Sequence, residues 1–523
     1  MTETGTRRSA AERALGGWAA PVLVGAMTAA VIGWLWGSLN PLPWVYDEAA
    51  YLLQAKIFAT WHWSAPGRPV PEFFEQVHVF VTPRLVPRYP PGHALLLVPG
   101  IWLGASALMP LLFSAVTGGL VFGVARRLAN GWVALMTWLV WITAPEELYL
   151  RPSFMSQTSS TLIWLLAWIA LARWQARGDR WALIMVAMFG AYAGVIRPIT
   201  AVALLIPVGV VVLNTIRARP DWAGVGMAAV AGLSVAALGP LWSFESTGRA
   251  FPTPYSEYSR VYTPWNLPGF RVDTAPPLRP EIPAISKFRR EWLPVHQSHR
   301  IERLPIILAE RIRGIVVTLW GGPGGAGWSW RYGLVPLALL GFVRLPSPVR
   351  VVGWGAAALV LVMLSLASRP LWTVYYLEVF PLLAFATGLG AWRAAEWVGA
   401  RSRRADLAPL LVVIALVASV PGIADRLVAA KDQQVTARMI RDDLARAIAG
   451  ISGRAIVFVA PGPAHRPHED LVSNEPDVDA ARVWVVHDRG ADNARLLTVA
   501  PGRTAYRFDP ADGSIVPFRT PAR

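Results

Sequence analysis

The sequence lacks cysteine altogether and has few charged residues. No cysteine occurs among its 523 residues, which excludes disulfide bonds and cysteine-ligated metal sites and is compatible with an oxidising compartment. Only 16% of the residues are charged, whereas soluble domains usually carry about 25%. The depletion affects the residues that a lipid bilayer excludes, so it favours a membrane protein.

The abundant residues are hydrophobic, aromatic or basic. Hydrophobic residues make up 54% of the chain, and 26 Trp and 12 Tyr suit a protein with many membrane–water interfaces. A net charge of +16 is typical of proteins that bind nucleic acid. Here, however, the arginines lie in short clusters between apolar segments. We therefore expect membrane lipids, and no nucleic acid, as partners.

Long apolar segments predict that the chain crosses a membrane many times. Residues 18–40 contain no charge, and a helix of that length crosses a bilayer of about 30 Å. Arg7, Arg8 and Arg13 precede it, which predicts a cytoplasmic N-terminus and an uncleaved first helix. The further candidate spans are 110–126, 131–145, 153–172, 181–196, 199–216, 223–243, 327–343, 350–368, 372–392 and 405–424.

The distribution of arginine predicts which loops face the cytoplasm. Predicted inner loops hold pairs or clusters of arginine, whereas the short outer loops near residues 145–152, 197 and 369 hold one each. This alternation predicts eleven spans, with the C-terminus outside. Residues 93–109 are too interrupted for a full span and are expected to form a re-entrant or interfacial helix.

Three segments are left for the outer face. They are a first loop at 41–91, a long Pro-rich loop at 244–326 and a tail at 426–523. The second loop is expected to end in an interfacial helix near 305–319. Since it is rich in arginine, it is expected to be solvated or to contact lipid headgroups, and it could also cover a site and recruit an anionic lipid.

The tail predicts a small soluble domain outside the cytoplasm. Residues 433–448 have a helical pattern, and residues 455–459 and 482–486 are rich in the β-branched residues of strands. The predicted architecture is therefore an α-helical polytopic membrane module at 1–425, followed by an α/β domain at 426–523.

The first outer loop combines two acids with a basic motif. Asp47 and Glu48 precede a good helix former with an apolar face, and by themselves they fit a helix cap and a favourable first-turn acid. The loop ends with Arg88-Tyr89-Pro90-Pro91-Gly92-His93, which by itself fits a turn between two helices. The presence of both motifs in one loop favours a functional site.

Together the two motifs resemble those of glycosyltransferases of the multi-span GT-C class, which use polyprenyl-phosphate-linked sugars. The nearest resemblance is to the family 39-like bacterial relatives of protein O-mannosyltransferases and to lipid A aminoarabinose transferases. In those families an Asp-Glu or Asp-Asp pair follows the first span, and a basic residue beside a Pro-Pro pair closes the same loop. The resemblance covers the N-terminal half best. The sequence departs from it at Tyr89, which separates Arg88 from Pro90.

The resemblance implies a location in the inner membrane of a bacterium. It also implies transfer of a hexose or pentose, with inversion, from a polyprenyl phosphate to a glycan, lipid or protein acceptor. Asp47 would take the proton of the acceptor hydroxyl, with Glu48 as a helper, because a hydroxyl is a weak nucleophile. Arg88 would hold the departing phosphate, whose negative charge grows as the bond breaks. Tyr89 and Arg197 are further candidates for phosphate contacts, although Arg197 also fits a simple interfacial arginine.

A divalent cation, Mg²⁺ or Mn²⁺, is compatible with the adjacent carboxylates of Asp47 and Glu48. Two acids alone do not specify such a site, because these ions usually take about six oxygen ligands. His296 and His299 in the second outer loop lack a third ligand at a suitable spacing. The sequence therefore predicts no certain metal.

Further polar residues near the outer face are candidates for a sugar cavity. Glu146 and Glu147 lie in the next outer loop, where related enzymes often place another acid; acids solvated in a loop are the alternative. Glu378 follows Tyr375 and Tyr376 about two turns into a predicted apolar helix, where an acid is costly unless it faces a cavity or a partner. The predicted set is Glu146, Glu147, His93, Tyr375, Tyr376 and Glu378.

Other functions remain open. A transporter or flippase of lipid-linked glycans would also have many spans, but such proteins commonly contain internal repeats, and the sequence shows none. An oligosaccharide ligase or polymerase would share both the spans and the lipid-linked donor, so the sequence does not separate it from a transferase. A membrane scaffold would leave the two motifs of the first loop without a role.

Overall fold

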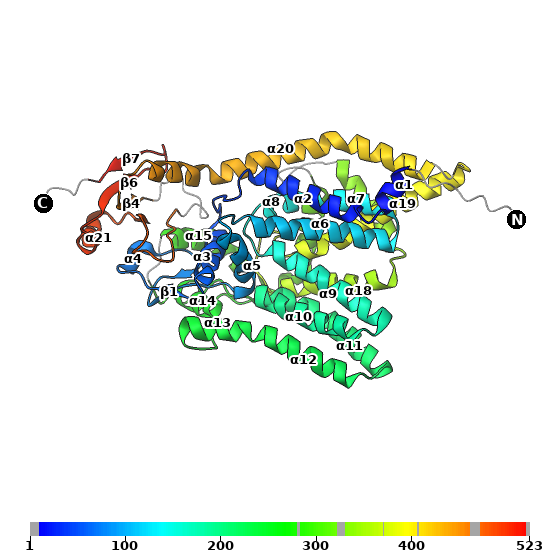
Figure 1. The fold of residues 1–523 in the computed structure, drawn as a ribbon, viewed down its shortest axis with the longest axis horizontal. Coiled ribbons are helices and arrows are strands. Elements are labelled where there is room, and N and C mark those ends of the chain that lie inside the picture. Colours follow the sequence, from blue (N-terminus) through cyan, green and yellow to red (C-terminus); the bar gives the residue numbers. More distant parts are fainter. Residues whose placement is uncertain are drawn as a thin grey trace.

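The computed structural model describes residues 10–279, 283–321, 330–369, 371–404, 407–460 and 471–518. Long helices run side by side in a bundle, and one end of this bundle carries shorter helices and two small sheets (Figure 1). The helix α20, Leu407–Ala449, runs along the bundle and continues into that end (Figure 1). This helix therefore links the bundle directly to the sheet-bearing end.

Each predicted span overlaps one or two helices of the bundle, although several bounds differ and residues 327–329 and 405–406 lie outside the described residues. Among the described residues, four helical runs are long and apolar enough by themselves to cross a membrane, and a fifth is a pair bent by 79°. The number of spans, eleven, therefore stays a prediction. The helices are α1 (Ala10–Gly16), α2 (Ala20–Trp36), α6 (Leu108–Leu128), α7 (Gly131–Ile142), α9 (Gln157–Arg177), α10 (Arg180–Ile196), α11 (Pro198–Ala218), α12 (Trp222–Ala236), α13 (Leu238–Thr247), α17 (Leu334–Phe342), α18 (Ser347–Met363), α19 (Phe380–Arg401) and α20.

Small residues allow the helices of the bundle to approach one another closely. A Cβ atom on Gly25 of α2 would collide with the carbonyl of Ala115 of α6. A Cβ atom on Gly390 of α19 would likewise collide with the carbonyl of Leu337 of α17. Backbone contact at small residues is typical of helices that associate within a membrane, where packing replaces the hydrophobic effect.

The first outer loop folds into helices and a three-stranded antiparallel sheet of order β1-β3-β2. The pairing places Ala65 opposite Leu85 and Val79 opposite Pro87. As a result His78 lies beside Arg88, whose backbone N–H donates a hydrogen bond of 2.9 Å to the carbonyl of His78. The elements are α3 (Tyr46–Ala59), β1 (Ala65–Pro66), α4 (Pro71–Phe74), β2 (Val79–Phe80), β3 (Arg84–Pro87) and α5 (Pro91–Trp102).

The second outer loop packs over the first. It forms α14 (Pro254–Tyr262), α15 (Pro283–Ser298) and α16 (Leu304–Trp320), of which the last coincides with the helix predicted near 305–319. The Thr253 side chain caps α14 by accepting a hydrogen bond from the backbone of Ser256. Tyr258 and Tyr262 on this helix share a buried apolar cluster with Tyr46 and Val77 of the first loop.

The C-terminal domain contains a four-stranded sheet of order β5-β4-β6-β7, which confirms the predicted small α/β domain. One face of this sheet packs on the end of α20, and the other packs on Phe73 and Phe74 of α4. The predicted helix at 433–448 is the last part of α20, so no break falls at residue 425. The remaining elements are β4 (Ala455–Val459), β5 (Val483–His487), α21 (Asn493–Val499), β6 (Thr504–Phe508) and β7 (Ile515–Pro517).

Candidate functional site

Asp47 lies in the first turn of α3 and faces the end of its own loop. Val45 is the residue before the helix, and no side chain caps it, so Asp47 is not the helix cap. Instead, the hydroxyl of Tyr89 donates a short hydrogen bond to Asp47 Oδ1. The Asp47 side chain keeps 25% of its surface exposed. One carboxylate oxygen is thus held by the protein while part of the group remains open to a ligand.

Arg88 is buried among three tyrosine rings. Its guanidinium carbon lies 5.3 Å from the ring centre of Tyr89, 4.6 Å from that of Tyr255 and 5.2 Å from that of Tyr258. These distances allow cation–π attraction. Only 4% of the residue is exposed, and its Nε and Nη1 atoms have no hydrogen-bond partner in the described part of the chain. Among the described residues, the same three tyrosines have the largest electrostatic effect on Arg88.

Glu48 points into the protein interior. It is fully buried, and the backbone N–H of Phe154 donates a hydrogen bond of 3.1 Å to its Oε2. Burial raises the pKa of Glu48 to about 7, although the charges of Arg438 and Arg441 on α20 act against this rise. Since Glu48 has no exposed surface, any help that it gives to Asp47 is indirect.

The second acidic pair begins α8, Pro145–Leu150, and its members have different surroundings. Glu147 is fully buried and accepts hydrogen bonds from Arg151 Nε at 2.5 Å and from Trp141 Nε1 at 2.7 Å. Glu146 is half-buried beside Thr373, and burial together with the charge of Glu147 raises its pKa to about 8. Glu147 therefore belongs to a buried ion pair. The sequence had instead predicted that this acid is solvated in a loop or faces a sugar cavity.

Glu378 and Arg197 lie close together near the end of the bundle that carries the two small sheets. Glu378 lies in the 3-10 turn η3, Leu377–Val379, just before α19, and not two turns inside a helix as predicted. Ser160 Oγ donates a hydrogen bond of 2.5 Å to Glu378 Oε1, and Arg197 Nη1 lies 3.8 Å from the same oxygen. Glu378 Oε2 has no hydrogen-bond partner within the described ranges.

Tyr375 lies between the Glu378–Arg197 pair and the site formed by Asp47 and Arg88. The guanidinium carbon of Arg197 lies 5.8 Å from the ring centre of Tyr375. The charges of Arg197, Asp47 and Arg88 all act on the Tyr375 hydroxyl, as does Tyr255. The structure therefore brings Asp47, Arg88, Arg197 and Tyr375 into one region, although Asp47 and Tyr375 are more than 300 residues apart in the sequence.

His93 and Tyr376 lie inside the protein. The His93 ring nitrogens are 2.8 Å from Ser159 Oγ and 2.8 Å from the carbonyl of Phe154, and the side chain has no exposed surface. Tyr376 is part of the main apolar core of the bundle. Neither side chain lines an open surface, so both fit a structural role better than the predicted cavity.

Comparison with known proteins finds similarity in fold alone. No protein-family model matches the sequence, and no curated protein is similar to it. Apo ArnT from Cupriavidus metallidurans, a lipid A aminoarabinose transferase, matches with a TM-score of 0.56 and 13% identity over 94% of this chain and 93% of that one. The same enzyme bound to undecaprenyl phosphate gives 0.51 and 14%, over 95% and 94% of the two chains. The chain has the GT-C fold. An apo oligosaccharyltransferase from Archaeoglobus fulgidus gives a TM-score of 0.48 and 12% identity over 91% of this chain and 65% of that one.

Within this GT-C fold, three side chains near Asp47 and Arg88 were not predicted from the sequence. His78 Nε2 lies 3.7 Å from Asp47 Oδ1, and Tyr255 and Tyr258 surround Arg88. The tyrosines could have been predicted to lie together. Tyr255, Tyr258 and Tyr262 are three and four residues apart after the helix start Thr253-Pro254, so they share one face of a helix. The position of His78 could not have been predicted, since its contact with Asp47 depends on the pairing of β2 with β3.

The donor groups around the acid pair do not fit a divalent cation. In the described part of the chain, no three His, Asp or Glu side chains converge as metal ligands would. Asp47 is engaged by Tyr89, whereas Glu48 is engaged by the backbone of Phe154. Mg²⁺ and Mn²⁺ need several oxygen ligands directed at one point, so we derive no step through a metal.

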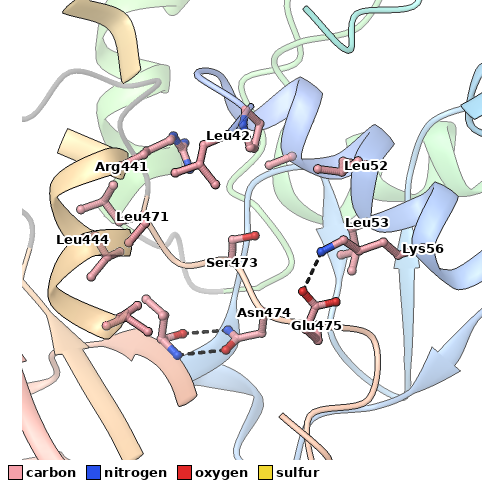
Figure 2. Close-up of a pocket in the computed structure, with 15 residues that line it drawn as sticks. Leu42, Leu52, Leu53, Lys56, Arg441, Leu444, Leu471, Ser473, Asn474 and Glu475 are labelled. Atoms are coloured by element: carbon pink, nitrogen blue, oxygen red, sulfur yellow. Dashed lines mark hydrogen bonds and ion pairs between the residues drawn. The ribbon is translucent and has the colours of Figure 1, made fainter. Parts of the chain in front are cut away.

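A cavity of about 230 Å³ lies between α3 and the C-terminal domain (Figure 2). Its α3 residues include Ala49, Leu52 and Lys56, which lie on the face of the helix opposite Asp47. Lys56 forms an ion pair of 2.6 Å with Glu475 at one side of this cavity (Figure 2). The cavity therefore separates α3 from the C-terminal domain and is distinct from the region around Asp47 and Arg88.

Proposed function

We propose that this protein is an integral membrane glycosyltransferase that moves a sugar from a polyprenyl phosphate to an acceptor on the outer face of the membrane. The observation that carries the proposal is the state of Arg88. A permanently charged guanidinium is buried with two nitrogen atoms lacking partners in the described residues, and the adjacent Tyr89 binds the partly exposed carboxylate of Asp47. A phosphate group would satisfy this charge, and a hydroxyl acceptor would use the carboxylate.

The energetics favour an anionic ligand at Arg88. A buried charge without a counter-ion is costly, and cation–π contacts with three tyrosines offset only part of this cost. A phosphate offers oxygen atoms that a guanidinium can bind in pairs. ArnT of Cupriavidus metallidurans, whose fold is similar, binds undecaprenyl phosphate. We infer that a polyprenyl phosphate, free or carrying a sugar, is the ligand here.

In the proposed reaction Asp47 is the general base. The acceptor oxygen forms a bond to the anomeric carbon while its proton passes to the Asp47 carboxylate. The bond between the anomeric carbon and the phosphate oxygen breaks, and the polyprenyl phosphate leaves with the electron pair. Arg88 stabilises the charge that grows on this phosphate, with Arg197 and Tyr375 nearby. A single displacement of this kind inverts the configuration of the sugar.

The arrangement of the chain supports an outer location for the site. The first loop, the second loop and the C-terminal domain all pack together at one end of the bundle. The arginine clusters between spans predict that the other end faces the cytoplasm. We therefore propose that the N-terminus is cytoplasmic and that the C-terminal domain lies outside it.

Binding of undecaprenyl phosphate to the detergent-solubilised protein tests this function. At about 100 times its dissociation constant, a ligand stabilises the folded protein by about 2.7 kcal/mol. Arg88→Met keeps most of the side-chain volume within the tyrosine rings but removes the charge. Loss of a charged hydrogen bond is worth about 1.5–3 kcal/mol, so the affinity should fall by roughly 10- to 100-fold. Arg88→Lys should recover part of this loss, because an ammonium is a point charge.

The matched control is Arg84→Met on β3. Arg84 is exposed and lies four residues before Arg88, so the control removes an equal charge from the strand that leads to Arg88. It should bind undecaprenyl phosphate as the wild type does, and neutral undecaprenol should raise the Tm of every variant equally little. Failure of the wild type to bind undecaprenyl phosphate would overturn the transferase proposal. Equal binding by wild type and Arg88→Met would remove Arg88 as the phosphate ligand.

A further inference from the structure

His78 adopts a backbone conformation that histidine seldom takes. It lies in the turn that leads into β2, and its φ angle is +69°. This left-handed region favours glycine, followed by asparagine and aspartate, because a Cβ atom crowds the backbone there. Both backbone groups of His78 are used, since its N–H donates to the Tyr258 hydroxyl at 2.9 Å and its carbonyl accepts from Arg88 at 2.9 Å. Strained residues of this kind often have functional roles.

The side chain of His78 is directed at the proposed base. Its Nε2 atom lies 3.7 Å from Asp47 Oδ1, the same oxygen that accepts the hydrogen bond from Tyr89. The imidazole makes edge contacts with the rings of Tyr46, Tyr89 and Tyr258, at centre distances of 5.0, 5.4 and 5.9 Å. The ring is thus fixed on several sides, while its Nε2 edge faces the carboxylate.

We propose that His78 is a positioning residue for the transfer reaction, a role that rests on the proposed function. His78 and Tyr89 together hold Oδ1 of Asp47, so that Oδ2 is the oxygen presented to the acceptor hydroxyl. The separation of 3.7 Å is longer than a hydrogen bond, and catalytic hydrogen bonds commonly shorten when the substrates bind. The acceptor proton moves to Oδ2 and leaves through the exposed part of Asp47. His78 itself neither gains nor loses a proton.

Two substitutions at this position separate positioning from a purely structural role. Glutamine places an amide N–H close to the position of Nε2, but it adopts the left-handed backbone poorly. Asparagine adopts this backbone readily, but its amide is too short to reach Asp47. Positioning through Nε2 predicts that His78→Gln retains more turnover than His78→Asn. A role in the turn alone predicts the reverse order, in turnover and in Tm.

The assay measures release of undecaprenyl phosphate from the lipid-linked sugars of the host membranes, beside binding of undecaprenyl phosphate to each variant. His78→Asn should lower kcat roughly 10- to 100-fold, as a misplaced catalytic group does, with KM for the donor unchanged. Binding of undecaprenyl phosphate should be unchanged, because Arg88 is intact. His62→Asn is the matched control, since His62 is exposed in the same outer loop and should leave turnover unaltered.

An Asp47→Glu background supplies a second readout. A glutamate carboxylate is displaced from His78, so in this background His78→Asn should reduce turnover by much less than it does in the wild type. An equal reduction in both backgrounds, or a higher activity of His78→Asn than of His78→Gln, would overturn the positioning role. Failure of the transferase proposal has a different signature, which is the absence of both undecaprenyl phosphate binding and release in the wild type.

Discussion

Two helices that follow spans of the bundle each carry a pair of adjacent acids in the first turn, and the two pairs have different surroundings. Asp47-Glu48 begins α3 and Glu146-Glu147 begins α8, in each case just after a helix of the bundle. In both pairs the second acid is fully buried and the first keeps some exposed surface. Glu147, however, forms an ion pair with Arg151 at 2.5 Å, whereas the hydrogen bond to Glu48 comes from a backbone N–H.

The difference shows how the same sequence pattern serves two purposes. Arg151 and Trp141 saturate Glu147, which makes it a structural anchor of its loop. In the first loop the exposed member, Asp47, faces Tyr89 and His78 and lies in the region of Arg88. Adjacent acids are therefore informative about chemistry only when the partners of each carboxylate are known.

The largest expected effect separates the exposed acids of the two pairs. Asp47→Asn should lower turnover by about 10²–10⁴-fold, because the general base is lost while size and hydrogen bonding remain. Glu146→Gln should leave most of the turnover at pH 7, because its raised pKa, about 8, keeps the native carboxyl mostly protonated and similar to an amide. Both are measured as release of undecaprenyl phosphate, with unchanged Tm as evidence of folding. A larger loss in Glu146→Gln than in Asp47→Asn would exchange their roles.

The next effect separates the buried acids by stability. Glu147→Gln leaves the guanidinium of Arg151 buried without its counter-ion, which typically costs about 3–5 kcal/mol. The Tm of the solubilised protein should therefore fall clearly, and more than in Glu48→Gln. The double variant Glu147→Gln with Arg151→Met should regain part of the loss, because it removes the unpaired charge. If the double variant is no more stable than Glu147→Gln, the ion pair does not explain the effect.

The smallest effect concerns the pH dependence of stability at Glu48. Its pKa is about 7 in the folded protein because of burial, against an ordinary value of 4.5. The unfolded chain thus loses this proton at lower pH than the folded one, so the stability contributed by protonated Glu48 is present below about pH 4.5 and is lost as the pH rises through about 7. Wild type should lose Tm more steeply than Glu48→Gln between these values. Parallel curves would show that Glu48 keeps its ordinary pKa.

Much of the bundle was predictable because its cause is local. A lipid bilayer requires runs of apolar residues, and every such run in the sequence became a helix. The bounds were less predictable where polar turns precede a helix, and α19 therefore begins at Phe380 rather than at 372. The ion pair of Glu147 with Arg151 was also within reach of the sequence, because acids and bases four residues apart meet on a helix. The sheet of the first loop was not, since its strands contain only two to four residues.

By itself the sequence determined that this is a helical membrane protein, that the loop after its first span carries Asp47 and Arg88, and that a small α/β domain follows the bundle. Only the tertiary structure decided which carboxylate is partly exposed and that, among the described residues, Arg88 is enclosed by tyrosines. The physical reason is that burial and counter-charge are contributed by distant segments: Tyr255 and Tyr258 enclose Arg88 from the second loop, and Arg438 approaches Glu48 from α20. No local sequence pattern specifies those distances. The difference between Asp47, the proposed base, and Glu147, the member of a buried ion pair, therefore appears only when the chain is folded.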